Sequence, residues 1–213
     1  MRMIEIIPAI NEDSFEEIER KITLIEPHVR WAHIDVTDGT FTRRAGWHEA
    51  SELFGLTTKL SLELHLMIAP MEERIMEWLL PPMHRAIFHV EAARNPSFVI
   101  KKIKEAGKEA GLALKLETPW ANVRPYAKEV DLLQALCVEP GYSGQVFKEE
   151  MYEKIRRIKR IAGHVPLEVD GGVTIGMVRQ CSLMGATLFA ASSAIFSAPD
   201  IAAAIKELSH DES

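Results

Sequence analysis

The sequence of 213 residues has few cysteines, no long apolar segment and no excess of positive charge. Its two cysteines, Cys137 and Cys181, lack the close spacing of a zinc motif, so we expect two buried free thiols in a reducing cytoplasm. No apolar run approaches the ~18 residues of a membrane span, which argues against a membrane protein. Acidic residues number 31 and basic residues 25, for a net charge of -6, so the chain does not resemble a nucleic-acid-binding domain.

No linker rich in glycine, serine or proline divides the chain, and we expect a single domain over residues 1–213. Apolar runs of the length of one strand alternate with amphipathic segments. Most of the runs are rich in Ile, Val and Leu, which is typical of parallel strands buried on both faces. The runs span residues 4–10, 31–36, 60–68, 86–90, 112–116, 132–138, 165–169 and 187–191.

Helical patterns occupy most of the gaps between these runs. They cover residues 13–27, begin again at residues 70 and 95, and continue over 148–162, 174–183 and 200–208, with weaker patterns at 49–54 and 122–129. Eight strand–helix repeats in this length predict a (β/α)8 TIM barrel. The alternative is an open doubly wound sheet, which would usually have fewer strands and a glycine-rich turn after the first one. Residues 8–11 contain no glycine, which favours the barrel.

Histidines and aspartates gather at the predicted carboxyl ends of the strands, where the reactive groups of such barrels lie. His33 and Asp35 share one face of the second strand, His65 lies near the end of the third, and Asp170 ends the seventh. Polar side chains inside a barrel are costly unless they are paired or bind a metal. These four residues therefore predict one divalent metal site, and mixed nitrogen and oxygen donors suit zinc, iron(II), manganese or cobalt. The alternative is a set of polar core residues that satisfy one another.

Small and hydroxylic residues follow the last two predicted strands. Gly171 and Gly172 would let backbone N–H groups approach an anion at the start of a helix. Ser192 and Ser193 follow the eighth strand, and barrels frequently bind phosphate after strands seven and eight. Residues 141–145, after the sixth strand, could close over such a site as a lid. The alternative for the glycine pair is a simple turn.

Taken in order, these segments resemble the ribulose-phosphate 3-epimerase family. The matching stretches span residues 8–10, 33–39, 64–67, 88–91, 138–147, 169–173 and 193–196, from the first predicted strand to the last. The resemblance implies a phosphate-binding TIM barrel that inverts C3 of a ketopentose 5-phosphate, D-ribulose 5-phosphate being the leading substrate. Its partner would be a small sugar phosphate, with no nucleic acid or membrane, and family members are often homo-oligomers.

The resemblance also implies roles for single residues. His33, Asp35, His65 and Asp170 correspond to the metal ligands, and Asp35 and Asp170 to the acid/base pair. The phosphate contacts correspond to Gly144, Gly171, Gly172 and Ser193. Epimerisation beside a ketone needs an acid/base group on each face of a planar intermediate, which two carboxylates on opposite strands would provide. The metal would stabilise the enediolate charge.

Several positions depart from the family pattern. Ala9 replaces a serine, while Thr37 and Leu136 replace two of the three methionines that line the metal pocket, Met67 being the third. We expect Thr37 to make this pocket more polar. Ser192-Ser193 replaces the family's Gly-Ser, and residues 42–47 differ from the usual Val-Pro-Asn loop.

These departures leave the exact substrate open. One alternative is a ketohexose 6-phosphate, such as allulose 6-phosphate, and another is a non-catalytic sugar-phosphate-binding protein on the same barrel. A decarboxylase or aldol-type synthase would need a lysine beside the aspartates, and the nearest lysine, Lys115, belongs to a different predicted strand.

Overall fold

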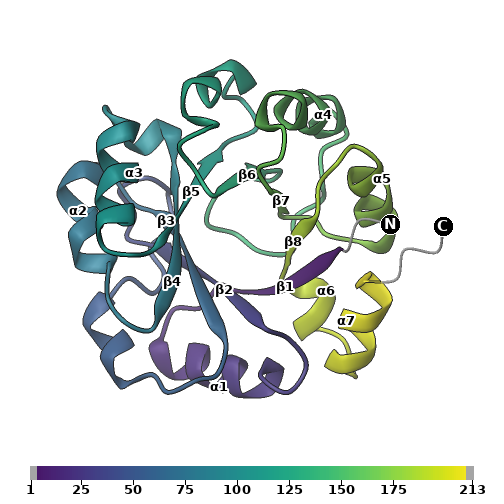
Figure 1. Ribbon diagram of the computed structural model, residues 1–213. Helices are drawn as coiled ribbons and strands as arrows, with labels where there is room; N and C mark the ends of the chain where they lie inside the picture. The colour runs from purple at the N-terminus through teal and green to yellow at the C-terminus, as the bar shows by residue number, and fades with distance from the viewer. Residues whose placement is uncertain (1–3, 210–213) are drawn as a thin grey trace.

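The computed structural model describes residues 4–209 and shows a closed barrel of eight parallel strands (Figure 1). The strands follow one another around the barrel in chain order, and β8 pairs with β1 to close it. The predicted TIM barrel is therefore confirmed, with one strand for each apolar run. The strands are β1 (Glu5–Ile10), β2 (Trp31–Thr37), β3 (Ser61–Met67), β4 (Met83–His89), β5 (Glu109–Leu114), β6 (Leu132–Leu136), β7 (Leu167–Asp170) and β8 (Leu188–Ala191).

Helices surround the barrel on the outside, as Figure 1 shows. The α-helices are α1 (Phe15–Ile25), α2 (Met71–Trp78), α3 (Pro96–Glu105), α4 (Met151–Ala162), α5 (Ile175–Leu183), α6 (Ser193–Phe196) and α7 (Ile201–Ser209). Short 3₁₀ helices occupy the other connections, namely η1 (Ala50–Gly55), η2 (Val90–Ala92), η3 (Trp120–Asn122) and η4 (Arg124–Tyr126). The prediction of a helix over residues 122–129 is wrong. Pro125 lies within this segment and has no N–H for a continuous ladder, so the chain forms two separate turns instead.

The strands divide the apolar core into two parts of different size. Outward-facing side chains such as Ile34, Leu64 and Phe88 pack with the helices in one large buried cluster. Inside the barrel, the apolar cluster is small and consists of Ile87, Ala113 and Leu132, with Leu188 packed against it. Strand alternation turns a second set of side chains inward, and many of these are polar. The buried polar residues include His33, Glu63, His65, Arg85, His89, Gln134, Glu168 and Asp170.

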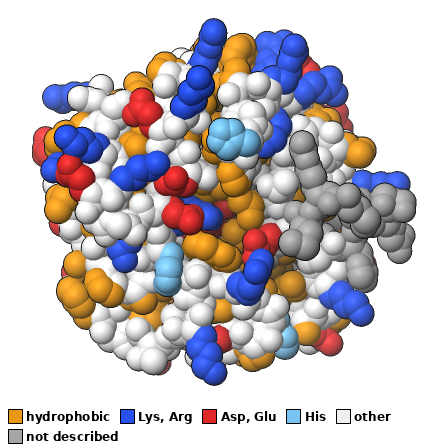
Figure 2. Space-filling model, viewed as in Figure 1, with side chains coloured by type: hydrophobic (Ala, Val, Ile, Leu, Met, Phe, Trp, Pro, Cys, Tyr) orange, Lys and Arg blue, Asp and Glu red, His pale blue; other side chains and the backbone are white. Residues whose placement is uncertain are grey.

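The surface carries mixed charge. On the face drawn in Figure 2, Lys and Arg side chains gather over α4 and are elsewhere interspersed with Asp and Glu. Within α4, Arg156 and Arg157 both pair with Glu153, which agrees with a solvated helix face. Within residues 4–209, no helix has the length and apolar character needed to cross a membrane. Cys137 and Cys181 are free and buried, as expected.

Helix α1 shows how the sequence directs this packing. Ser14 caps the helix by accepting a hydrogen bond from the Glu17 N–H. Ile18, Ile22 and Ile25 then fall on the face that is buried against the barrel. We expect Ile18→Ala to lower the free energy of unfolding by about 2–4 kcal/mol, because the side chain is fully buried.

Urea denaturation followed by circular dichroism measures this change. Leu24→Ala in the same helix is the matched control, since Leu24 is 43% exposed and should lose less than about 0.5 kcal/mol. Equal losses for the two variants would contradict the assignment of the buried face.

Candidate metal and phosphate site

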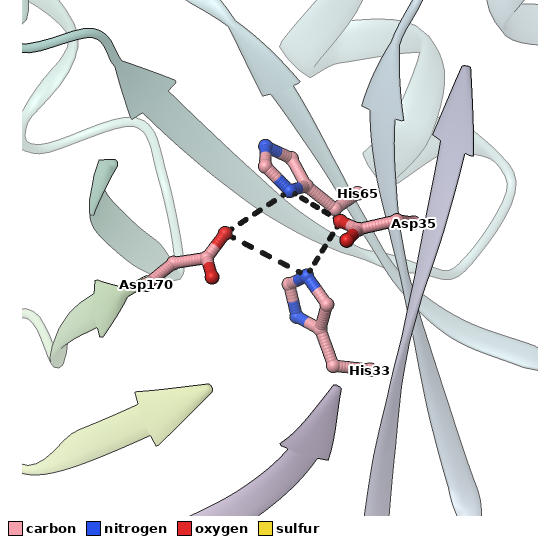
Figure 3. Close-up of side chains that lie close together, drawn as sticks. All are labelled: His33, Asp35, His65 and Asp170. Carbon is pink, nitrogen blue, oxygen red and sulfur yellow. Dashed lines mark hydrogen bonds and ion pairs between the residues drawn. The ribbon is translucent and has the colours of Figure 1, made fainter. Parts of the chain in front are cut away.

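Four side chains from three strands point toward one another at the carboxyl end of the barrel (Figure 3). His33 and Asp35 come from β2, His65 from β3 and Asp170 from β7. Nδ1 of His65 lies 3.0 Å from Oδ1 of Asp35 and 3.3 Å from Oδ2 of Asp170. Nε2 of His33 lies 3.4 Å and 4.0 Å from the same two oxygens. One potential ligand atom from each residue lies within 4.8 Å of the others, which is the spacing of a metal site.

Electrostatic coupling within this cluster is strong. Burial alone raises the pKa of Asp35, but the imidazoles of His33 and His65 outweigh it and hold that pKa well below its usual range. Burial in turn lowers the pKa of both histidines, yet the surrounding carboxylates raise each of them above the ordinary value. The carboxylates therefore need positive charge beside them, which is the environment that favours a bound cation.

A carboxylate beneath the cluster fixes the tautomer of His33. Oε1 of Glu63 lies 2.8 Å from Nδ1 of His33, and Arg85 donates to Oε2 of Glu63 at 2.6 Å. Burial raises the pKa of Glu63, but His33 and Arg85 outweigh it and keep this carboxyl ionised. An ionised carboxylate can only accept, so Nδ1 of His33 carries a proton, and Nε2 is the nitrogen that faces the cluster.

A second histidine orients His65. The Nε2 atoms of His65 and His89 are 2.8 Å apart, and Nδ1 of His89 lies 3.3 Å from Oε2 of Glu91. Burial lowers the pKa of His89 to about 4, so this ring is neutral and has one proton. Oε2 of Glu91 favours the proton on Nδ1, although the two atoms make no hydrogen bond, and Nε2 of His89 then accepts from His65. Nδ1 of His65 is thereby directed at the two aspartates.

An unpartnered nitrogen shows that these four side chains fit a divalent metal. Nε2 of His33 is fully buried and has no hydrogen-bond partner, although two carboxylates lie near it. A cation would satisfy this nitrogen and neutralise the carboxylates together. A second group, formed by His33, Glu63 and Glu168, lies deeper in the barrel. Glu63 in that group already pairs with Arg85, so the upper group is the better cation site.

A pocket opens beside the cluster at the carboxyl ends of the strands. Asp35, His65 and Asp170 lie on its wall together with Ala9, Met67 and Leu136. Thr37, the fourth residue expected at the pocket, is buried at the end of β2. Its hydroxyl oxygen accepts a hydrogen bond of 2.8 Å from the Gly46 N–H in the following loop.

The other wall of the pocket consists of the segments predicted to bind phosphate. Gly144, Gly171, Gly172 and Ser193 all lie on it. Gly172 has a φ of +69°, and a Cβ there would lie 2.5 Å from the backbone nitrogen of Phe147. Only glycine allows the turn after β7 to approach the loop after β6 this closely. Among residues 4–209, no Lys or Arg lines this pocket, so an anion there would depend on N–H groups and hydroxyls.

Sequence analysis gave no role to several residues that complete this site. Glu63, His89 and Glu91 orient the two histidines, and Asn11 donates to Oδ2 of Asp35 at 2.8 Å. For two of them, Glu63 and His89, the position in the sequence indicates a place in the site. Glu63 lies two positions before His65 on the same strand face, and His89 ends β4 as His65 nearly ends β3. The contacts of Asn11 depend on loop geometry, which no strand pattern reports.

The fold and the site together define a TIM-barrel enzyme with a metal-binding cluster and an adjoining pocket. The profile of the "Ribulose-phosphate 3 epimerase family" matches residues 5–196. The chain belongs to this family, which confirms the resemblance drawn from its motifs and the expectation of an epimerase-like enzyme.

Individual relatives agree with this assignment. A ribulose-phosphate 3-epimerase of Mycobacterium bovis is 32% identical over 184 residues, covering 84% of this chain and 80% of the relative. One of Escherichia coli K12 is 30% identical over 159 residues, covering 73% and 70%.

Solved structures of other enzymes share the fold. A 3-hexulose-6-phosphate synthase superposes with a TM-score of 0.65 at 16% identity, covering 97% of each chain. An orotidine 5′-phosphate decarboxylase of Pyrococcus horikoshii gives a TM-score of 0.67 at 14% identity, covering 95% of this chain and 96% of the other. At these identities the likeness extends to the fold alone.

Titration of chelator-treated protein with Zn²⁺ or Mn²⁺ should give one bound ion per chain. We expect His65→Ala to weaken this binding by more than the roughly 10–100-fold that loss of an outer-shell partner costs, because it removes a ligand. Isothermal titration calorimetry measures the affinity. His164→Ala is the control, since this exposed histidine precedes β7 at the end away from Asp170. Unchanged affinity in His65→Ala would place the ion elsewhere.

Proposed function

We propose that this protein epimerises C3 of a ketose phosphate, converting D-ribulose 5-phosphate to D-xylulose 5-phosphate by proton transfer between two carboxylates. The observation that carries the proposal is the placement of Asp35 and Asp170. They come from β2 and β7, strands that are not neighbours, and both border one pocket. Inversion of a carbon beside a ketone needs an acid/base group on each face of a planar intermediate, and these two carboxylates are placed to provide them.

The ionisation of the pocket suits Asp35 as the first base. The pKa of Asp35 lies well below its ordinary value, so this carboxylate is ionised at neutral pH and able to accept the C3 proton. Asp170 would return a proton to the opposite face, and the two roles exchange in the reverse direction. Gln134 Nε2, 3.3 Å from Oδ2 of Asp170, helps to hold that carboxylate.

The chain's own residues would hold one divalent metal through His33, Asp35, His65 and Asp170. When bound, the ion supplies Lewis-acid stabilisation of the negative charge that develops on the substrate oxygens. Glu63 and His89 keep the two imidazoles in the tautomers that face this position. Met67 and Leu136 give the pocket wall an apolar portion beside the two carboxylates.

The phosphate group would lie at the other end of the pocket. Gly144, Gly171 and Gly172 bring the backbone to the pocket wall, and Ser193 adds a hydroxyl there. A phosphate held at this end would fix the sugar so that C3 lies between the two aspartates. The metal cluster and the glycine wall therefore divide the pocket into a reacting end and a binding end.

Asp35→Asn and Asp170→Asn should each lower kcat for epimerisation by about 10²–10⁴-fold, because each removes one of two acid/base groups. A coupled assay with D-ribulose 5-phosphate at saturating metal, with bound metal quantified, measures the loss. In deuterium oxide, each variant should still exchange the C3 proton of one epimer, and the two variants should favour opposite epimers.

Full epimerase activity in either variant would contradict the two-base mechanism. The same assay with allulose 6-phosphate tests the alternative substrate, and we expect a lower kcat/KM for it. Tight binding of both sugars without any exchange at C3 would instead show a non-catalytic binding protein.

Gly172→Ala should raise KM for the sugar phosphate by at least about 10-fold, because a Cβ at this position would meet the backbone of Phe147. Inhibition by inorganic phosphate should weaken by a similar factor. Gly176→Ala in α5 is the matched control. Nothing lies within 4 Å of a Cβ there, so KM should not change and the helix should gain up to about 1 kcal/mol. A normal KM in Gly172→Ala would separate this turn from phosphate binding.

A further inference from the structure

Arg44 joins three loops at the mouth of the barrel. Its Nη1 donates to Oδ1 of Asn11, which follows β1, and to the carbonyl oxygen of Gly141 after β6, at 3.1 Å. Its Nη2 donates to the carboxylate of Asp13. The Arg44 side chain is only 25% exposed, although the loop that carries it lies at the surface. Three partners from two other loops, Asn11 and Asp13 after β1 and Gly141 after β6, therefore hold one guanidinium in place.

Asn11 extends these contacts to the proposed base. Its Nδ2 donates to Oδ2 of Asp35 at 2.8 Å, which leaves Oδ1 of Asp35 facing His33 and His65. A guanidinium only donates, so the atom of Asn11 that contacts Arg44 must be the amide oxygen. Arg44 thereby prevents the amide from turning over and keeps its NH₂ group on Asp35.

The contact with Gly141 reaches the binding end of the pocket. Gly141 begins the segment that carries Gly144, and both line the pocket. Thr42 lies against Gly141, and its hydroxyl donates to the Arg44 carbonyl oxygen at 2.5 Å. The side chain and the backbone of Arg44 thus both support the place where the two loops meet.

We propose that Arg44 is a positioning residue with two separable effects. Through Asn11 it fixes the orientation of the Asp35 carboxylate, and through Gly141 it holds the loop at the phosphate end of the pocket. The roles of Asp35 and of the phosphate end rest on the proposed function. Arg44 lies within residues 42–47, the segment that departs from the usual Val-Pro-Asn loop of the family.

A double-mutant cycle separates the two effects. Arg44→Met should lower kcat at least about 10-fold and raise KM several-fold, whereas Asn11→Leu should lower kcat to a similar extent and leave KM within about 2-fold. In the Asn11→Leu background, Arg44→Met should raise KM without a further loss of kcat. Compared with Arg44→Met, Arg44→Lys should restore either KM or kcat but not both. One ammonium cannot contact Asn11, Gly141 and Asp13 together as the guanidinium does.

Arg43→Met is the matched control, because it removes the same charge one residue away. Arg43 is exposed, and it makes no hydrogen bond or ion pair with the residues from 4 to 209. Equal effects of Arg43→Met and Arg44→Met would overturn the proposal and indicate an effect of net charge. Equal losses of kcat from Arg44→Met in both backgrounds would overturn the link through Asn11.

Metal affinity provides a readout that does not depend on turnover. If Arg44 orients Asp35 through Asn11, then Arg44→Met and Asn11→Leu should weaken Zn²⁺ binding by a similar factor of about 10, and the double variant should show no further loss. Additive losses would overturn the link. An absence of epimerase activity in the unmodified protein would refute the proposed function, while this titration would still decide the role of Arg44.

Discussion

The site depends on the neutralisation of negative charge that is buried inside the barrel. Glu63 and Glu168 are fully buried, and Asp35 and Asp170 lie directly above them. Burial and the nearby Glu63 raise the pKa of Glu168 well above normal, which lets this carboxyl remain neutral. Glu63 is compensated by Arg85 and His33, whereas the two aspartates face imidazoles and an unpartnered nitrogen. Charge balance therefore concentrates the demand for a cation at the upper end of the barrel.

The two parts of the core divide stability and chemistry between them. The large apolar cluster lies between strands and helices, and its side chains point away from the site. The interior has few apolar residues, and its polar residues pair in an ordered series from Arg85 through Glu63 to His33. The side chains of the candidate site thus lie on strands whose positions are fixed by packing elsewhere.

The sequence predicted the barrel well because apolar periodicity and strand length are local signals. It also placed His33, Asp35, His65 and Asp170 at strand ends, and the structure brings these four together. The segment 122–129 failed because Pro125 interrupts what otherwise resembles a helix. The turn of Thr37 toward Gly46 and the contacts of Asn11 with Arg44 could not be foreseen, because both depend on how separate loops fold against each other.

The two cysteines have a practical consequence. Burial raises the pKa of Cys137 well above normal and that of Cys181 to about 12, so both remain thiols at neutral pH. Thiols of this kind react slowly with alkylating agents, because the thiolate is the nucleophile. A cysteine introduced at an exposed position such as Val146 would therefore carry a fluorophore almost alone. The loop beyond β6 can thus be labelled in solution without first removing any native residue.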